Sequence, residues 1–324
     1  MRDMISVFSA TNDRKPAVLA VLLSNLPVSE REQQICELLE AEREKLLSLD
    51  GLLAAVKDNQ IVGAALFLMQ PDRCAYVWRP VVLDSTDSAP VADALLSDMG
   101  KRIQQENAWI GQCLIDPHET LDREALSRNG FPHLADLHYL SRPLADPIPD
   151  SEEIRLTPIR YGQGENHERF RQVIERTYIG SLDCPGIQGN RTGEDAIISH
   201  QSTGVFLPDQ WTIFSDERGD AGLLLLAEHP EQQAWEVVYM GIVPEARGNR
   251  YGREILLTGL AAAKSAGCES VVLAVDSNNQ FARRLYDGLG FQQTETRSVH
   301  AMIPSSGNKD VDRPQIVNNP QTGE

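Results

Sequence analysis

The chain has 324 residues, and its 30 lysines and arginines against 47 aspartates and glutamates give a formal net charge of −17. This charge disfavours general binding to nucleic acid or to anionic membranes, and it mildly favours an amine-bearing substrate. The five cysteines form no CxxC pair, so we expect reduced thiols rather than a disulfide framework or a metal site. The first residues lack the apolar core of a signal peptide, and no apolar run is long enough to cross a membrane. We therefore expect a cytoplasmic protein.

The first half of the sequence predicts alternating strands and helices. Two apolar runs, 52–56 and 61–69, flank a turn at 57–60 and predict a β-hairpin. The predicted order continues with a strand at 75–83, a helix at 89–106, a strand at 108–115, a helix at 120–128, Gly130-Phe131 and a strand at 137–140.

The second half predicts the same order again, after a linker at 143–153 that is rich in proline and acidic residues. A helix at 165–178 is followed by a hairpin of 211–214 with 222–228, a strand at 237–243, a helix at 253–266, a strand at 270–275, a helix at 279–287 and a strand at 297–303. Gly290-Phe291 lies 291 − 131 = 160 residues after its counterpart. A repeated order indicates a duplicated unit.

A basic loop with two glycines, Gly248 and Gly252, connects the predicted strand 237–243 to its helix. A loop of this kind points backbone N–H groups at one spot, and together with the helix dipole it favours a bound anion, a diphosphate better than a single carboxylate. Arg247, Arg250 and Arg253 add positive charge. The alternative is an ordinary strand–helix connection with a solvated basic face.

Downstream, Asn279, Ala282 and Tyr286 recur at helical spacing and share one helix face. Together, the loop and this helix resemble the GNAT superfamily of N-acetyltransferases. The family's diphosphate signature is Gln/Arg-x-x-Gly-x-Gly/Ala, and Arg247 and Gly252 match its ends, whereas Arg250 stands where the middle glycine is usual. The family's later motif, Asn-x-x-Ala-x-x-x-Tyr followed by Gly-Phe, is matched residue for residue. The resemblance covers about 211–304 and is weak before that.

The resemblance implies an α/β (α+β) fold with two tandem GNAT-like domains, each a mixed, mostly antiparallel sheet flanked by helices. We place a degenerate, structural domain at 1–145, an acetyl-coenzyme A-binding N-acetyltransferase domain at 154–304 and a disordered tail at 305–324. The first domain is degenerate because Glu119 and Leu126 replace Asn279 and Tyr286, and because its loop at 84–89 is acidic and lacks glycine. The architecture is similar to that of tandem GNAT proteins such as mycothiol synthase, a likeness that does not carry the substrate over.

The resemblance also implies roles for single residues. Tyr286 would be the general acid and Glu236 the general base, sharing a strand face with Val238 and Met240. The alternatives are core packing for Tyr286 and a solvated strand end for Glu236, with His300 or a water chain as the base. Asn279 would hold the pantetheine arm or, alternatively, cap its helix. The implied coenzyme-binding residues are Met240, Gly241, Ile242, Val243, Arg247, Gly248, Asn249, Arg250, Tyr251, Gly252, Arg253, Asn279 and Ala282.

The predicted function is acetyl-coenzyme A-dependent acetylation of an amine by direct attack. The alternatives are a non-catalytic acyl-coenzyme A-binding or regulatory module and a tandem transferase of another acyl group. We expect a small-molecule or peptide amine as substrate, and no metal, nucleic acid or membrane as partner. The loop Cys184-Pro185-Gly186 lies where the family places its acceptor pocket, although a turn with an unreactive thiol is the alternative. The acceptor and the oligomeric state are not predicted.

Overall fold

The structure is a computed structural model that describes residues 5–83, 88–151, 156–161, 166–187 and 189–304. The expected tail at 305–324, part of the linker and most of the acidic loop at 84–89 lie outside these ranges. None of the helices in the described ranges combines the length and the apolar character that a membrane crossing requires.

The first repeat contains the hairpin and the strand–helix alternation that its sequence predicts. Its elements are β1 (Ser6–Ser9), α1 (Lys15–Leu22), α2 (Val28–Arg43), β2 (Leu52–Lys57), β3 (Gln60–Met69), β4 (Cys74–Val82), α3 (Ser88–Gln105), β5 (Ile110–Ile115), α4 (Thr120–Arg128) and β6 (His133–Pro143). The sequence pattern did not predict β1, α1 or α2. In the case of α2, the polar sequence gives little periodic signal, and the helix buries none of its residues.

The second repeat contains the predicted elements, with ends that differ by a few residues, and three elements that were not predicted, β7, α6 and β8. Its elements are β7 (Thr157–Arg160), α5 (His167–Tyr178), α6 (Gly193–Gln201), β8 (Val205–Phe206), β9 (Thr212–Asp216), β10 (Gly219–His229), β11 (Ala234–Ile242), α7 (Tyr251–Ser265), β12 (Ser270–Asp276), α8 (Gln280–Gly288) and β13 (Gln292–Met302). The mixed, mostly antiparallel α/β architecture is confirmed.

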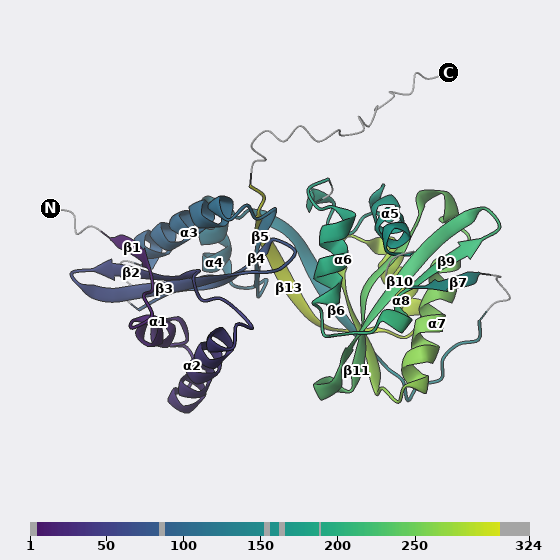
Figure 1. The fold of residues 1–324 in the computed structure, drawn as a ribbon, viewed down its shortest axis with the longest axis horizontal. Helices are drawn as coiled ribbons and strands as arrows, with labels where there is room; N and C mark the ends of the chain where they lie inside the picture. Colours follow the sequence, from purple (N-terminus) through teal and green to yellow (C-terminus); the bar gives the residue numbers. More distant parts are fainter. Residues whose placement is uncertain (1–4, 84–87, 152–155, 162–165, 188, 305–324) are drawn as a thin grey trace, which may run out of the picture.

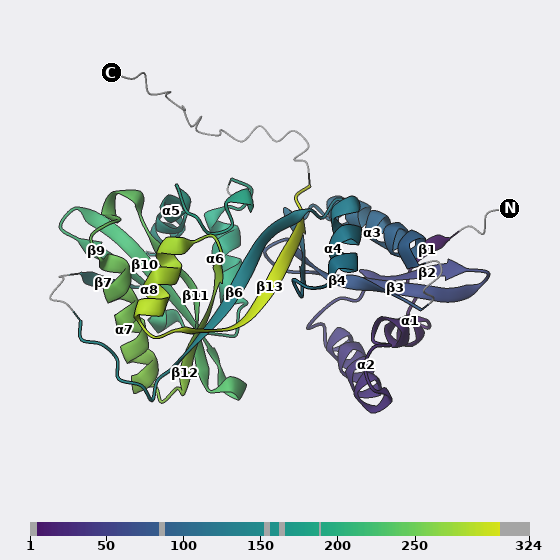
Figure 2. The same cartoon turned by 180° about the vertical axis from the view of Figure 1, so that it is seen from behind.

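The two repeats form two lobes that exchange their last strands, β6 and β13, which run side by side from one lobe to the other (Figure 1; Figure 2). The described residues form one 13-stranded sheet in which β13 lies between β5 and β6, and β6 lies between β13 and β12. Each repeat therefore completes the sheet of the other. Residues that are distant in sequence set this pairing, so the local pattern gave no signal for it.

Two apolar cores hold the second lobe together, one on each face of its sheet. One core packs α7 and α8 against side chains such as Leu224 and Val237. The other packs α5 and α6 against side chains such as Leu223 and Leu225. The alternation of Leu223, Leu224 and Leu225 between these cores is the period-two pattern of a strand that is buried on both faces.

β11 and β12 are parallel but stay paired for a short distance only. Ala234–Glu236 pair with Ser270–Val272, and beyond these residues the strands separate. A β-bulge at Val238 accompanies the separation, because Leu225 pairs with Tyr239 and Leu226 pairs with Val237. An extra residue bends its strand and interrupts the ladder. The result is a wedge-shaped opening in the middle of the second lobe.

Candidate active site

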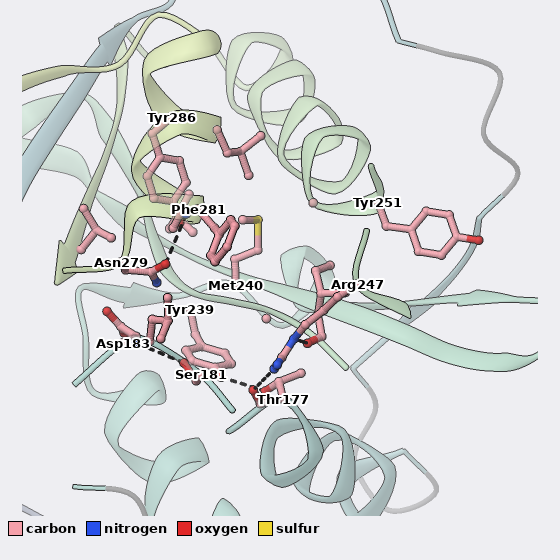
Figure 3. Close-up of a pocket in the computed structure, with 18 of the residues that line it drawn as sticks. Thr177, Ser181, Asp183, Tyr239, Met240, Arg247, Tyr251, Asn279, Phe281 and Tyr286 are labelled. Atoms are coloured by element: carbon pink, nitrogen blue, oxygen red, sulfur yellow. Dashed lines mark hydrogen bonds between the residues drawn. The ribbon is translucent and has the colours of Figure 1, made fainter. Parts of the chain in front are cut away.

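A cavity of about 970 Å³ occupies the opening between β11 and β12. Its walls come from the end of β11, the loop before α7, the start of α7, α8 and the segment that follows α5, as Figure 3 shows. The volume lies at the upper end of the range for small-molecule and coenzyme sites. Nearly all the residues predicted for the site line this one cavity. The exceptions are Glu236, Val243 and Asn249.

The edge of β11 that faces the cavity supplies backbone donors. Val243 is fully buried and donates its N–H to Ala221 O at 3.0 Å, so its amide belongs to the sheet and not to a ligand. Successive residues of a strand point their N–H groups to opposite edges, so Met240 and Ile242 point theirs away from β10 and toward the opening. The prediction of four coenzyme-contacting amides was therefore wrong for Val243 and, by the same alternation, for the Gly241 N–H, which points toward β10.

Gly241 allows α5 to lie close to this strand. A Cβ atom at Gly241 would come within 2.7 Å of Thr177 Cβ, which is closer than real Cβ contacts. A side chain at this position would therefore push α5 away from β11. Thr177 in turn shares a hydrogen bond of 2.8 Å with the Tyr239 hydroxyl, which fixes the end of α5 over the strand.

The loop before α7 has the curvature of an anion-binding loop. Gly248 has φ +82°, and Arg250, at the N-cap of α7, has φ +60°. A left-handed conformation at Arg250 explains why the family signature usually has glycine there, because a side chain at such a φ is strained. The Asn249 side chain supports the turn by donating to Ala246 O at 3.1 Å. The first N–H groups of α7, at Tyr251 and Gly252, point toward the N-terminal end of the helix.

The side chains of this loop hold the walls of the cavity in place. The Arg247 guanidinium donates to Ile242 O at 3.1 Å, Gly180 O at 3.2 Å and Thr177 O at 3.0 Å, which ties the end of α5 to β11. Arg253 donates to Asp150 O. The Tyr251 hydroxyl donates to Asp216, and in Figure 3 the ring points away from the other labelled residues.

Asn279 caps α8, which is one of the two roles that its sequence motif suggests. Its Oδ1 accepts from the Ala282 N–H at 3.2 Å. The side chain also lines the cavity, so the cap and a ligand contact are compatible. The cap orients the Nδ2 donor toward the same opening, where Figure 3 shows Asn279 beside Met240 and Phe281.

Tyr286 lies on α8 and lines the cavity. The residue is only 6% exposed, and its ring packs against Phe291 with centroids 5.6 Å apart. Burial raises the pKa of the phenol, and the charge of Asp183 raises it further. The hydroxyl therefore carries its proton at neutral pH, as a general acid requires. Core packing and a place in the cavity lining are both observed for this ring.

Neither residue suggested as the base lines the cavity. Glu236 pairs with His229 at 2.7 Å at the far end of β11. The predicted common face with Met240 was wrong, because the bulge at Val238 reverses the alternation. His300 is buried on β13, where its Nδ1 lies 3.0 Å from Phe131 O in the region that joins the two lobes.

Asp183, which the sequence analysis missed, reaches the site from the segment after α5. Its carboxylate accepts from the Asp276 N–H at 3.1 Å, and the Asp276 carboxylate accepts from the Cys184 N–H at 3.1 Å. Burial raises the pKa of Asp183, and the neighbouring Asp276 charge raises it further. Phe281, which is 74% exposed and lies at the rim of the cavity, was also missed. A lone carboxylate in an irregular segment gives no periodic signal.

Comparison with known proteins agrees with this arrangement. The sequence profile of the Acetyltransferase (GNAT) family matches residues 198–291. The mycothiol acetyltransferase of Mycobacteroides abscessus is 43% identical over 272 residues, which cover 75% of this chain and 82% of that protein. The GCN5-related N-acetyltransferase from Sphaerobacter thermophilus has a TM-score of 0.62 at 17% identity, covering 94% of this chain and 97% of that chain, which shows the likeness of the folds.

Two further matches cover little more than half of the relative. The mycothiol acetyltransferase of Thermobispora bispora is 31% identical over 166 residues, which cover 47% of this chain and 52% of that protein. The match to the protein of the same name from Nocardiopsis dassonvillei covers 59% of that protein. The long match at 43% identity covers more than two thirds of both proteins, and the family profile matches within the second repeat. The chain therefore belongs to the GNAT family of N-acetyltransferases.

Proposed function

We propose that this protein transfers an acetyl group from acetyl-coenzyme A to an amine, and that the second repeat carries the active site. One observation carries the proposal. A single cavity of about 970 Å³ brings together the glycine-bearing loop before α7, the exposed edge of β11, Asn279 and Tyr286. The relatives named mycothiol acetyltransferase support acetyl transfer to a small molecule.

The residues present fit coenzyme A. A Cβ atom at Gly248 would meet no atom within 4 Å, so the space beside the loop is open. The amides of Tyr251 and Gly252, with the dipole of α7, suit a diphosphate. Asn279 and the β11 edge would hold the pantetheine arm. Acetyl-coenzyme A supplies the activated thioester, and the N–H groups of Met240 and Ile242 would hold the carbonyl oxygen as negative charge develops.

Tyr286 would be the proton donor for the sulfur of the leaving coenzyme A. Its side chain comes from α8 and lines the same cavity as Met240 and Asn279 (Figure 3). Because burial keeps the phenol protonated, Tyr286 Oη would give its proton to the leaving sulfur. The carboxylate of Asp183 borders the same space and would accept the proton of the attacking amine.

A coenzyme A release assay with a panel of amines tests the proposal. We expect thiol release that depends on both acetyl-coenzyme A and an amine. Tight binding of acetyl-coenzyme A without amine-dependent release across the panel would instead assign the chain to the non-catalytic binding modules. Faster release from a longer acyl donor would indicate a transferase of that acyl group.

A further inference from the structure

A second, smaller cavity of about 150 Å³ adjoins the coenzyme site. It lies between the end of α5, the segment that leads to α6, and the bulged part of β11. The two cavities share Ser181, Asp183, Val238 and Tyr239 in their linings. A molecule in the smaller cavity would therefore lie next to the thioester end of the larger one.

Three buried polar atoms around the smaller cavity have no hydrogen-bond partner among the described residues. They are the Tyr178 hydroxyl, Arg191 Nε and His200 Nε2. The Arg191 guanidinium nevertheless lies near enough to the Tyr178 hydroxyl to act against the rise in the pKa of this phenol, so a ligand here would meet the two groups together. His200 is only 8% exposed, and its ring stacks on Tyr239 with centroids 5.3 Å apart. Buried polar groups are almost always paired in native proteins. Three of them around one small cavity indicate that a ligand supplies the missing partners.

The charges around the smaller cavity define the ligand further. The Arg191 guanidinium lies over the Trp109 ring and donates to Ala196 O at 3.4 Å, and none of the ion pairs formed within the described ranges includes it. Burial and the Arg191 charge lower the pKa of His200, so its ring is neutral. A cation, a hydroxyl and a neutral imidazole around one space match a carboxylate, which accepts several hydrogen bonds.

At the opposite end, where the two cavities meet, the lining is acidic. Asp183 lines both cavities there, and the described structure places no basic side chain in an ion pair with it. An amine suits this end as well as a carboxylate suits the other. The small volume keeps the two groups of the ligand close together.

We propose that the smaller cavity binds an α-amino acid as the acetyl acceptor, with its carboxylate held by Arg191, Tyr178 and His200 and its amine beside Asp183. This inference rests on the proposed function. The amine nitrogen forms a bond to the acetyl carbon while the carbon–sulfur bond breaks. The amine proton passes to Asp183, and the sulfur takes the proton of Tyr286 Oη, so that atoms and charges balance.

A matched acceptor series tests the proposal with the full-length protein. Each proteinogenic L-amino acid is compared with its amide, which lacks the carboxylate charge, and with the amine that lacks the whole carboxyl group. Rates are expressed per concentration of unprotonated amine. For the preferred side chain, we expect kcat/KM to fall on the order of tenfold for the amide and further for the decarboxylated amine. An amide or simple amine that equals its amino acid overturns the assignment.

Two variants separate the carboxylate contacts from the fold. Tyr178→Phe removes one hydroxyl, and Arg191→Lys keeps the charge but removes the Nε donor. We expect both to raise KM for the amino acid several-fold and to leave KM for the decarboxylated amine and the affinity for acetyl-coenzyme A unchanged. Equal effects on both acceptors overturn the proposal.

The outcomes also distinguish this inference from the proposed function. Acetylation of other amines but of no amino acid refutes the inference alone. Failure to bind acetyl-coenzyme A refutes the proposed function. If no acceptor is acetylated, calorimetric titration of the amino acids into the coenzyme A complex still decides the inference, because the absence of binding contradicts it.

Discussion

The two repeats share one backbone design and differ in the side chains that face its opening. In the first repeat, β4 and β5 pair over only three residues, Cys74–Tyr76 with Ile110–Gln112, as β11 and β12 do in the second. In both repeats, the first strand of this parallel pair also has a register shift against the strand that precedes it. The shift lies between Ala64 and Leu66 in the first repeat and between Leu225 and Leu226 in the second. The wedge is therefore a property of the repeat, and the backbone alone does not make an active site.

The two repeats differ in the residues at the start and on the inner face of the helix that follows, α4 in the first repeat and α8 in the second. Glu119 and Asn279 precede α4 and α8 with nearly equal angles, φ −76° and ψ 74° against φ −78° and ψ 71°. Asn279 caps its helix, whereas the Glu119 side chain does not. Leu126 is buried in an apolar cluster at the position of Tyr286. At these two positions the first repeat has the backbone and the apolar packing of the second, but not the capping amide or the phenol.

The first repeat nevertheless contacts the segment before α6, which lines the smaller cavity. Trp109 lies against Arg191, and Arg73 pairs with Asp195 at 3.0 Å. Asp195 belongs to the capping box that begins α6. Ile187 and Leu134 pack in a small shared apolar cluster. These contacts predict that the first repeat positions the acceptor site while the second repeat binds the coenzyme.

The largest expected effect comes from giving the second repeat the acidic character of the first. Gly252→Asp places a carboxylate at the N-terminus of α7, where it repels a diphosphate, so we expect acetyl-coenzyme A binding to become undetectable by calorimetry. Gly252→Ala is the control, because its Cβ would meet Leu285 at an ordinary 3.4 Å. An unchanged affinity in folded Gly252→Asp would mean that the diphosphate binds elsewhere.

The next effect comes from the hydroxyl of Tyr286. Tyr286→Phe keeps the packed ring and removes the proton donor, so kcat should fall about 10²-fold, the usual scale for a positioned acid. The dissociation constant of acetyl-coenzyme A, measured in parallel, should change little. Tyr286→Leu, which copies Leu126 of the first repeat, should lose as much activity. A Phe variant with full kcat would assign the ring to packing alone.

A comparison of two carboxylates identifies the base. Asp183→Asn can still accept from the Asp276 N–H but cannot take a proton, and we expect kcat/KM to fall about tenfold or more. Glu236→Gln is the matched variant outside the cavity, and its pH–rate profile should overlay that of the wild type. The reverse result, with Glu236→Gln impaired and Asp183→Asn active, would restore Glu236 as the base.

The smallest effect tests the contribution of the first repeat. Trp109→Ala removes the ring beneath Arg191, an interaction on the order of 0.5–1 kcal/mol, so KM for the acceptor should rise about two- to fivefold. The affinity for acetyl-coenzyme A should stay the same. Leu121→Ala, at an 80% exposed position of the same repeat, serves as the control. A change in coenzyme affinity instead of acceptor KM would contradict the division of roles.

The sequence predicted those parts of the site that short-range patterns encode. Helical spacing placed Asn279, Ala282 and Tyr286 on the cavity, and the glycine-bearing loop was found from its order after a strand. The bulge at Val238 was not predictable from alternation, because one extra residue reverses every later side chain. This reversal made the predicted shared face of Glu236 and Met240 wrong.

The remaining features depend on long-range contacts. Asp183, Arg191 and His200 come together because the segment between α5 and α6 folds back over β11 and rests on the first repeat. No spacing in the sequence indicates this. The exchange of β6 and β13 likewise depends on pairing between strands about 160 residues apart, as between Val299 and Ala135. The boundary placed between 145 and 154 remains a division of the sequence, because the sheet continues across both repeats.

The stoichiometry of acetyl-coenzyme A binding tests most directly the claim that a shared frame carries one functional site. Isothermal titration of the full-length protein should give one site per chain, and that site should be lost in Gly252→Asp. Two equivalent sites per chain, or one site that persists in folded Gly252→Asp, would contradict the account.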